Sequence, residues 1–205
     1  MLIRIHPDNP DPRQVKKALD VLRDGGVIIY PTDGVYAFGC DIYKSKAVER
    51  IAQLKGIKPE KADFSFVFDD LSRITEFARP VDTPVYKLLK QCLPGPYTFI
   101  LNANNSVPKL FKNNKRTLGI RIPDNPICRL LVSELGNPII SASVHDEDEI
   151  LEYTTDPELI HERYRDMVDA VIDGGYGALV PSTVIDCSSG IPELVRLGAG
   201  EVDFE

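Results

Sequence analysis

The sequence predicts an α/β fold, a single domain built on a twisted, open, mixed sheet with helices packed on it. Three observations favour this fold. Segments with helical apolar spacing alternate with short apolar runs of strand length, without the strict repeat of a βαβ protein. The length of 205 residues fits one domain. The composition, 43% hydrophobic and 27% charged, is that of a globular protein with a buried core.

Cap residues and apolar spacing mark the helices. Asp11 followed by Pro12 has the form of an N-cap and a first helical residue, and apolar side chains then recur at helical spacing as far as Leu22. Further helices are expected to open at Ser45, Thr83, Asp124 and Asp156. Ser45 and Asp124 are expected to act as N-caps.

The strands are short and end in turn residues. The continuous apolar run from Val27 to Tyr30 predicts a buried strand that stops at Pro31. Strands are expected at residues 2–5, 27–30, 64–68, 97–101, 118–122, 138–143, 170–173, 183–187 and 194–197. No internal repeat interrupts this pattern, so the prediction remains one sheet in one domain.

The charge distribution bears on partners. Net charge is −7, and an acidic total argues against a general nucleic-acid coat, because phosphate binding needs cations. The cations are nevertheless concentrated in residues 44–61 and 109–121. A local basic surface is therefore expected within an acidic chain.

The cysteines and the N-terminus predict the compartment. Cys40, Cys92, Cys128 and Cys187 are scattered, so they form no zinc pattern and are expected to be reduced residues of a cytoplasmic protein. No signal segment and no membrane-spanning run is present, so no membrane partner is expected. We expect one domain over residues 1–205, with its core at about residues 12–200 and no additional C-terminal domain.

Two stretches place polar residues beside buried strands. Residues 30–36 end a strand in a Pro-Thr-Asp turn, which is either a ligand-binding strand end or an ordinary turn. Residues 117–123 carry Arg121 among apolar neighbours. An arginine in a packed strand needs an anionic partner, which is either a structural carboxylate or a carboxylate or phosphate of a substrate.

Three further stretches are weaker signals on their own. Residues 55–61 hold three lysines near a Gly-Pro loop, which either bind a polyphosphate or form a solvated charged loop. Residues 140–143 and 181–186 place small hydroxyl side chains at strand ends, where they are either turn residues or ligand contacts. The three histidines fit no metal or triad pattern, and no nucleophile elbow is present.

Taken in order, these five stretches resemble the YrdC/YciO family from about Val15 to Gly200, together with Val195-Arg196-Leu197-Gly198. The resemblance implies a YrdC-like sheet with a basic concave surface. Catalytic members of the family are threonylcarbamoyl-AMP synthases, which use L-threonine, bicarbonate and ATP with Mg²⁺. Their product serves the threonylcarbamoyladenosine modification at position 37 of tRNA. The family is also associated with binding of double-stranded RNA.

The resemblance assigns roles to individual residues. Matches to amino-acid contacts are Thr32, Arg121 and Ser182. Matches to nucleotide contacts are Lys55, Thr117, Ser141 and Arg196. Residues expected to act in catalysis are Lys55, Arg121 and Ser141, and residues expected to bind RNA are Lys55, Lys58 and Lys61. ATP and Mg²⁺ are expected to bind as a substrate complex, and no resident metal is expected.

Two motif positions differ from the catalytic pattern. Ile57 stands where the Lys-x-Arg motif has its arginine, and Ser143 stands where the Ser-x-Asn motif has its asparagine. Neither side chain can replace the one it stands for, because isoleucine has no charge and serine is shorter and lacks the amide. The chain therefore resembles the YciO-like branch. We expect a threonylcarbamoyl-AMP synthase-like nucleotidyltransferase of reduced or altered activity, or alternatively a protein that binds tRNA, ribosomal or double-stranded RNA without turnover.

Overall fold

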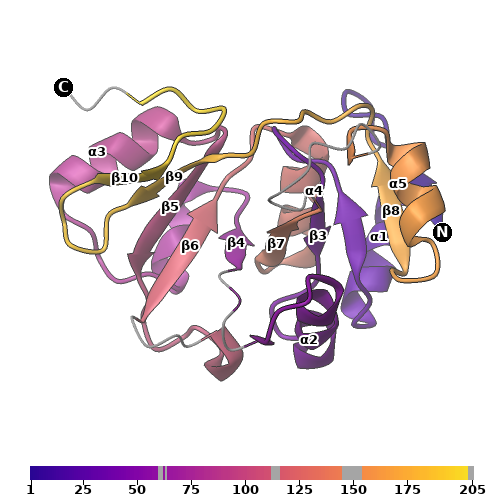
Figure 1. Ribbon diagram of the computed structural model, residues 1–205, viewed down its shortest axis with the longest axis horizontal. Helices are drawn as coiled ribbons and strands as arrows, with labels where there is room; N and C mark the ends of the chain where they lie inside the picture. The colour runs from indigo at the N-terminus through magenta and orange to yellow at the C-terminus, as the bar shows by residue number, and fades with distance from the viewer. Residues whose placement is uncertain (60–61, 63, 112–115, 145–153, 203–205) are drawn as a thin grey trace.

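The computed structural model describes residues 1–59, 62, 64–111, 116–144 and 154–202. Within these residues ten strands form one mixed, open sheet in the order β1-β8-β2-β3-β7-β4-β6-β5-β9-β10. The N-terminus lies near one end of the long axis, and α3, β9 and β10 lie near the other (Figure 1). The predicted α/β class with a twisted mixed sheet is confirmed.

The elements follow the predicted order with shorter bounds. The strands are β1 Leu2–Arg4, β2 Ile28–Tyr30, β3 Ala37–Gly39, β4 Ser65–Val67, β5 Tyr97–Asn102, β6 Thr117–Arg121, β7 Ile139–Ser143, β8 Ala170–Asp173, β9 Thr183–Asp186 and β10 Glu193–Arg196. The helices are α1 Pro12–Arg23, α2 Ser45–Leu54, α3 Thr83–Cys92, α4 Pro126–Leu135 and α5 Pro157–Tyr164, with short 3₁₀ helices η2 Leu71–Glu76 and η3 Lys109–Phe111.

Distant parts of the chain pair in the sheet. The parallel pair of β1 and β8 brings Leu2 opposite Val171. In the middle of the sheet, β4 pairs with β6 in parallel and with β7 antiparallel. The connection from β8 to β9 crosses the molecule from one half of the sheet to the other (Figure 1). Among the described residues, no helix combines the length and the apolarity that a membrane crossing requires.

Two apolar clusters cover the two faces of the sheet. The larger one joins Phe66, Ile120 and Ile140 of the central strands to α2, α3 and α5. The smaller one joins Val67 and Ile139 to α1 and α4. Because successive strand residues point to opposite faces, Arg121 and Ser141 lie on the same face as the smaller cluster.

Three local expectations need correction. The N-cap of α2 is Lys44, which makes no side-chain cap bond, so Ser45 is the first helical residue and not the cap. The N-cap of α4 is Asn125, whose side chain accepts from the amide of Cys128, so Asp124 is not the cap. Strand β3 was not predicted, because it has only three residues and includes alanine and glycine, which are depleted in strands.

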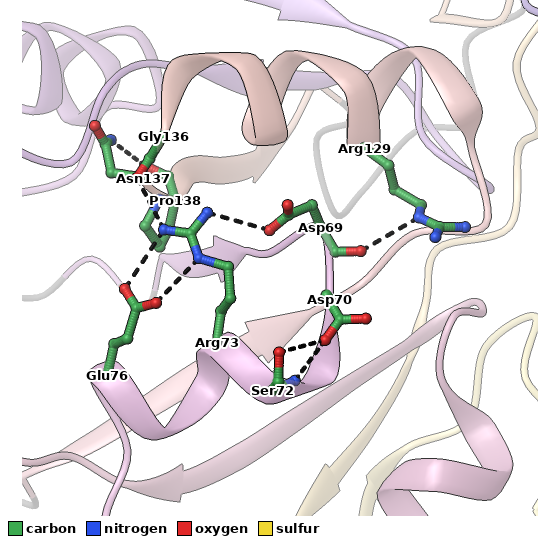
Figure 2. A network of polar contacts seen from close by, with 9 residues as sticks. All are labelled: Asp69, Asp70, Ser72, Arg73, Glu76, Arg129, Gly136, Asn137 and Pro138. Atoms are coloured by element: carbon green, nitrogen blue, oxygen red, sulfur yellow. Dashed lines mark hydrogen bonds and ion pairs between the residues drawn. The ribbon is translucent and has the colours of Figure 1, made fainter.

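A polar network around Arg73 joins η2 to the end of α4 (Figure 2). The Arg73 guanidinium donates to the Gly136 carbonyl (2.8 Å) and to the carboxylates of Glu76 (3.0 Å) and Asp69 (3.3 Å). Gly136 is the C-cap of α4 and has a left-handed backbone, and the last carbonyls of a helix lack intrahelical partners. Arg73 therefore satisfies a helix end and fixes η2 against it.

We expect Arg73→Ala to lower the free energy of unfolding by about 1.5–3 kcal/mol, the usual loss for hydrogen bonds to a charged group. Arg165→Ala is the matched control, because Arg165 is exposed and forms a longer ion pair with Asp166 (3.6 Å); it is expected to cost less than about 0.5 kcal/mol. Urea unfolding measures both. Equal losses in the two variants would show that the network adds no stability.

Candidate functional site

In the turn after β2, the hydroxyl proton of Thr32 is already used in a hydrogen bond. Its Oγ1 donates to the carbonyl of Val35 (2.8 Å) and accepts from the amide of Gly34 (3.1 Å). A hydroxyl has one proton and two lone pairs, so buried Thr32 is left with one lone pair and no proton. Any ligand group that meets this hydroxyl must therefore be a hydrogen-bond donor.

Arg121, at the end of β6, forms a buried ion pair with Asp33. Nη2 of Arg121 lies 2.9 Å from Oδ1 of Asp33, and the two side chains are 8% and 7% exposed. The other carboxylate oxygen accepts from the amide of Asp124 (2.9 Å). The structural carboxylate that the sequence offered as one alternative is thus present.

The ion pair does not use all the donors of the guanidinium. Nε of Arg121 is buried and has no hydrogen-bond partner among the described residues. A buried unpaired donor next to a positive charge is costly, and a carboxylate can satisfy it while bonding a terminal nitrogen of the same guanidinium. The second alternative, an anionic ligand, therefore stays open at the same side chain.

Ser182 lies in a second cluster, one strand away from Arg121. Its hydroxyl is 2.8 Å from that of Thr98 on β5, and its carbonyl accepts from Nη2 of Arg196 (2.9 Å). Strands β5 and β6 are antiparallel, with Phe99 opposite Ile120. One residue further along, Thr98 is opposite Arg121, so these two side chains share a face of the sheet. The structure thus places Ser182 and Arg196 on the same side as Arg121.

Ser141 and Thr117 extend the same face. Ser141 on β7 is buried, and its side chain interacts with the hydroxyl of Tyr30. Thr117 starts β6, four residues before Arg121, which puts it about 13 Å away along the strand. The row of polar positions is therefore long enough for a ligand larger than an amino acid.

The lysine stretch occupies a different place. Lys55 is the C-cap of α2, which packs on the opposite face of the sheet. Lys58 follows it and is exposed, whereas Lys61 lies outside the described residues. The roles predicted for these lysines in phosphate and RNA binding stay predictions.

Burial keeps two neighbouring groups neutral. Desolvation raises the pKa of the Cys128 thiol, which lies near Arg121 and Asp33, although the arginine opposes the shift. Desolvation also raises the pKa of the Tyr30 hydroxyl. Neither group is ionised at neutral pH, so neither acts as a nucleophile or base there.

Sequence reasoning missed two residues of the site. Thr98 was assigned only to the strand expected at residues 97–101. Asn125, which caps α4, also donates to the Thr32 carbonyl (3.3 Å). The strand alternation around Phe99 could have indicated that Thr98 faces away from the larger cluster. Nothing in the sequence indicated that Asn125 would reach the turn after β2.

Comparison with known proteins identifies the family. The family model described as Sua5_yciO_yrdC, telomere recombination, matches residues 20–198. The chain belongs to the Sua5/YciO/YrdC family. The prediction from the sequence is confirmed.

Relatives in the family fall into two groups. An uncharacterized protein of Haemophilus influenzae is 43% identical over 96% of this chain and 94% of its own length. The uncharacterized protein YciO of Escherichia coli K12 is 41% identical over 97% of this chain and 95% of its own length. A threonylcarbamoyl-AMP synthase of Coxiella burnetii is 27% identical over 90% of this chain and 97% of its own length.

Solved structures of the family share the fold. The crystal structure of E. coli YciO superposes with a TM-score of 0.90 at 39% identity, covering 98% of this chain and 97% of that one. The crystal structure of P. abyssi Sua5 complexed with L-threonine superposes with a TM-score of 0.86 at 24% identity, covering 97% of this chain and 57% of that one. The second likeness shows the fold alone.

The two motif positions that differ from the catalytic pattern of the family are accessible. Ile57 is 40% exposed and lies outside both apolar clusters. Ser143 ends β7 and is half-buried, two residues beyond Ser141 and on the same face. Larger polar side chains at these positions would not have to displace core residues.

We expect Asp33→Ala to lower the free energy of unfolding by about 3–5 kcal/mol, because it leaves the buried charge of Arg121 uncompensated. The control is Asp20→Ala, which removes the exposed pair with Lys16 and should cost less than about 1 kcal/mol. Chemical denaturation gives both values.

The double variant Asp33→Ala with Arg121→Met removes both charges and should be more stable than Asp33→Ala alone. Simple addition of the two single losses would contradict the role given to this ion pair.

Proposed function

We propose that this chain is a threonylcarbamoyl-AMP synthase-like nucleotidyltransferase, of reduced or altered activity, that acts on L-threonine, bicarbonate and ATP. The observation that carries the proposal is the buried Nε of Arg121, which has no hydrogen-bond partner in the part of the chain that the structure describes and lies on the face shared with Ser141, Ser182 and Arg196. The synthases among the relatives support it, since they align along most of the chain.

An amino acid fits the donors and acceptors of this site. Arg121 offers Nε together with a terminal nitrogen, a pair that binds a carboxylate in a bidentate manner. Thr32 has only an acceptor to offer, which suits an N–H or O–H of the same ligand. The hydroxyl of Ser182, shared with Thr98, either donates or accepts. A zwitterionic hydroxy amino acid such as threonine has the matching groups.

The proposed reaction needs no covalent intermediate with the protein. The amine of L-threonine adds to the carbon of bicarbonate and water leaves, which gives a carbamate. A carbamate oxygen then attacks the α-phosphorus of ATP, and the bond to pyrophosphate breaks, which gives threonylcarbamoyl-AMP. Positioning of the two reactants supplies most of such a rate enhancement.

In this proposal the nucleotide lies along the polar face beyond Arg121. Thr117, Ser141 and Arg196 would contact it, whereas Lys55 caps α2 on the opposite face of the sheet and would not contact the nucleotide in this arrangement. Magnesium would arrive on the phosphates of ATP, as it commonly does, and would withdraw charge from the attacked phosphorus. The described residues contain no group of three or more acidic, histidine or cysteine side chains that could hold a metal ion by themselves.

We expect the protein to release pyrophosphate slowly from ATP in a reaction that depends on L-threonine and bicarbonate, with the adenylate detected by mass spectrometry. Arg121→Lys should raise the KM for L-threonine about tenfold to a hundredfold, because lysine keeps the charge but loses the bidentate geometry. Arg23→Lys is the matched control, since Arg23 is an exposed arginine on α1 that bonds the Glu134 carbonyl.

The proposal fails if L-threonine neither raises the melting temperature nor stimulates pyrophosphate release. Steeply salt-dependent binding of double-stranded RNA or tRNA by the same inactive protein, lost on Lys55→Ala with Lys58→Ala, would favour the alternative function.

We expect Ile57→Arg combined with Ser143→Asn to raise adenylate formation at least about tenfold, because a single preorganised charge-stabilising contact is typically worth about 10²–10³ in rate. Ile57→Lys with Ser143→Asn is the control for charge without a guanidinium. Circular dichroism checks the fold, which the exposure of Ile57 should preserve. A folded double variant that is no faster than the wild type would show that these two positions do not limit the reaction.

A further inference from the structure

Three neighbouring strands place small residues side by side in the middle of the polar face. Ser65 on β4 is in register with Gly119 on β6 and with Ser141 on β7. The next residues along each strand, Phe66, Ile120 and Ile140, belong to the larger apolar cluster on the other face. Ser65 therefore points to the same side as Arg121 and Ser141.

The Ser65 hydroxyl differs from the other hydroxyls of the site. Thr32, Thr98 and Ser182 are each hydrogen-bonded, and Ser141 interacts with Tyr30. Ser65 is half-buried, and no side-chain hydrogen bond is recorded for it within the described residues. Its proton is free for a ligand.

Gly119 keeps this hydroxyl uncovered. A Cβ on Gly119 would lie 2.9 Å from the Oγ of Ser65, closer than real Cβ atoms come to other atoms. The backbone of Gly119 is not in the left-handed region, so its conformation does not require glycine. A methyl group at this position would force the Ser65 hydroxyl to move, so the glycine leaves the space over Ser65 open.

Small residues alone do not make a binding site, but Arg121 independently indicates a ligand on this face. Its side chain is 8% exposed and its Nε has no partner among the described residues. Gly119 and Arg121 are two residues apart on β6 and face the same way, about 7 Å from each other. A ligand anchored on Arg121 and extending along β6 passes over Gly119.

We infer that Ser65 and Gly119 form a subsite for the group joined to the amino nitrogen of the amino acid, with the Ser65 hydroxyl donating to an oxygen of its carbamoyl or α-phosphoryl portion. The carboxylate carbon and the nitrogen of an amino acid are only two bonds apart. Gly119 is about 7 Å from Arg121 along the strand, backbone to backbone, and the Asp33 carboxylate that holds the guanidinium also bonds the Asp124 amide past the end of β6. With the carboxylate of the ligand at that end, Gly119 faces the part of the ligand beyond the amino acid itself. This inference rests on the proposed function.

The test separates the two halves of the ligand. Isothermal titration calorimetry measures the affinity for L-threonine alone, and then for the α,β-methylene analogue of ATP with Mg²⁺ in the presence of saturating L-threonine and bicarbonate. Ser65→Ala should leave the first affinity within about twofold. It should weaken the second about three- to tenfold, the value of one neutral hydrogen bond. Ser65→Thr retains the hydroxyl and should restore most of the second affinity.

Variants of Gly119 test the geometry. Gly119→Ala should weaken binding of the analogue, because its methyl group meets the Ser65 Oγ. Gly119→Ala with Ser65→Ala relieves that contact and should fold as stably as Ser65→Ala, yet its affinity for the analogue should stay at or below that of Ser65→Ala. Recovery to the wild-type affinity in the double variant would overturn the role of the hydroxyl.

The outcomes distinguish the inference from the function on which it rests. Wild-type protein that binds neither L-threonine nor the analogue overturns the proposed function and the subsite with it. Wild-type binding of both, with Ser65→Ala unchanged for both or weakened equally for both, overturns the subsite alone.

Discussion

The ion pair between Arg121 and Asp33 is the interaction on which the candidate site depends. The two residues are 88 positions apart in the sequence, and their contact fixes the turn after β2 against the end of β6. Two buried charges are stable only when each has good partners. Asp33 has two, from Arg121 and from the amide of Asp124. The Nε of Arg121 has no partner within the described ranges of the chain, so the requirement for a further partner falls on the arginine.

The surrounding hydrogen bonds give the site a direction. At Arg121 all groups donate, and at Thr32 the single remaining position accepts. A ligand must therefore present acceptors at one place and a donor at the other, and reversing it would oppose donor to donor. The buried hydroxyls of Thr98 and Ser182 are less selective, because they are bonded to each other and either one can be the donor. The orientation of the ligand is thus selected by Arg121, which can only donate, and by Thr32, which can only accept.

Much of the fold could be read from the sequence, because its signals are local. The Asp11 cap and the apolar spacing behind it define α1, and Asp11 does accept from the amide of Arg13. The cap of α4 was misplaced by one residue, because Asp124 and Asn125 are both good cap candidates. The cap of α2 was misplaced because Lys44, which precedes Ser45, occupies the cap position without a side-chain cap bond. For the site, Arg121 was identifiable because a charge among isoleucines needs a partner. Ser65 and Thr98 were not, since their place depends on the register between strands, which no local pattern determines.

The pairing of β1 with β8 also has a consequence for how the chain is made. Leu2 lies opposite Val171, so β1 leaves the ribosome some 170 residues before the strand with which it pairs. At about 5–20 residues per second, that delay is on the order of 10–35 s. The site is completed later still, because Ser182 and Arg196 come after β8 in the chain. A nascent chain therefore carries β1 without its partner strand for that time, and the candidate site is assembled only after Arg196 has been made.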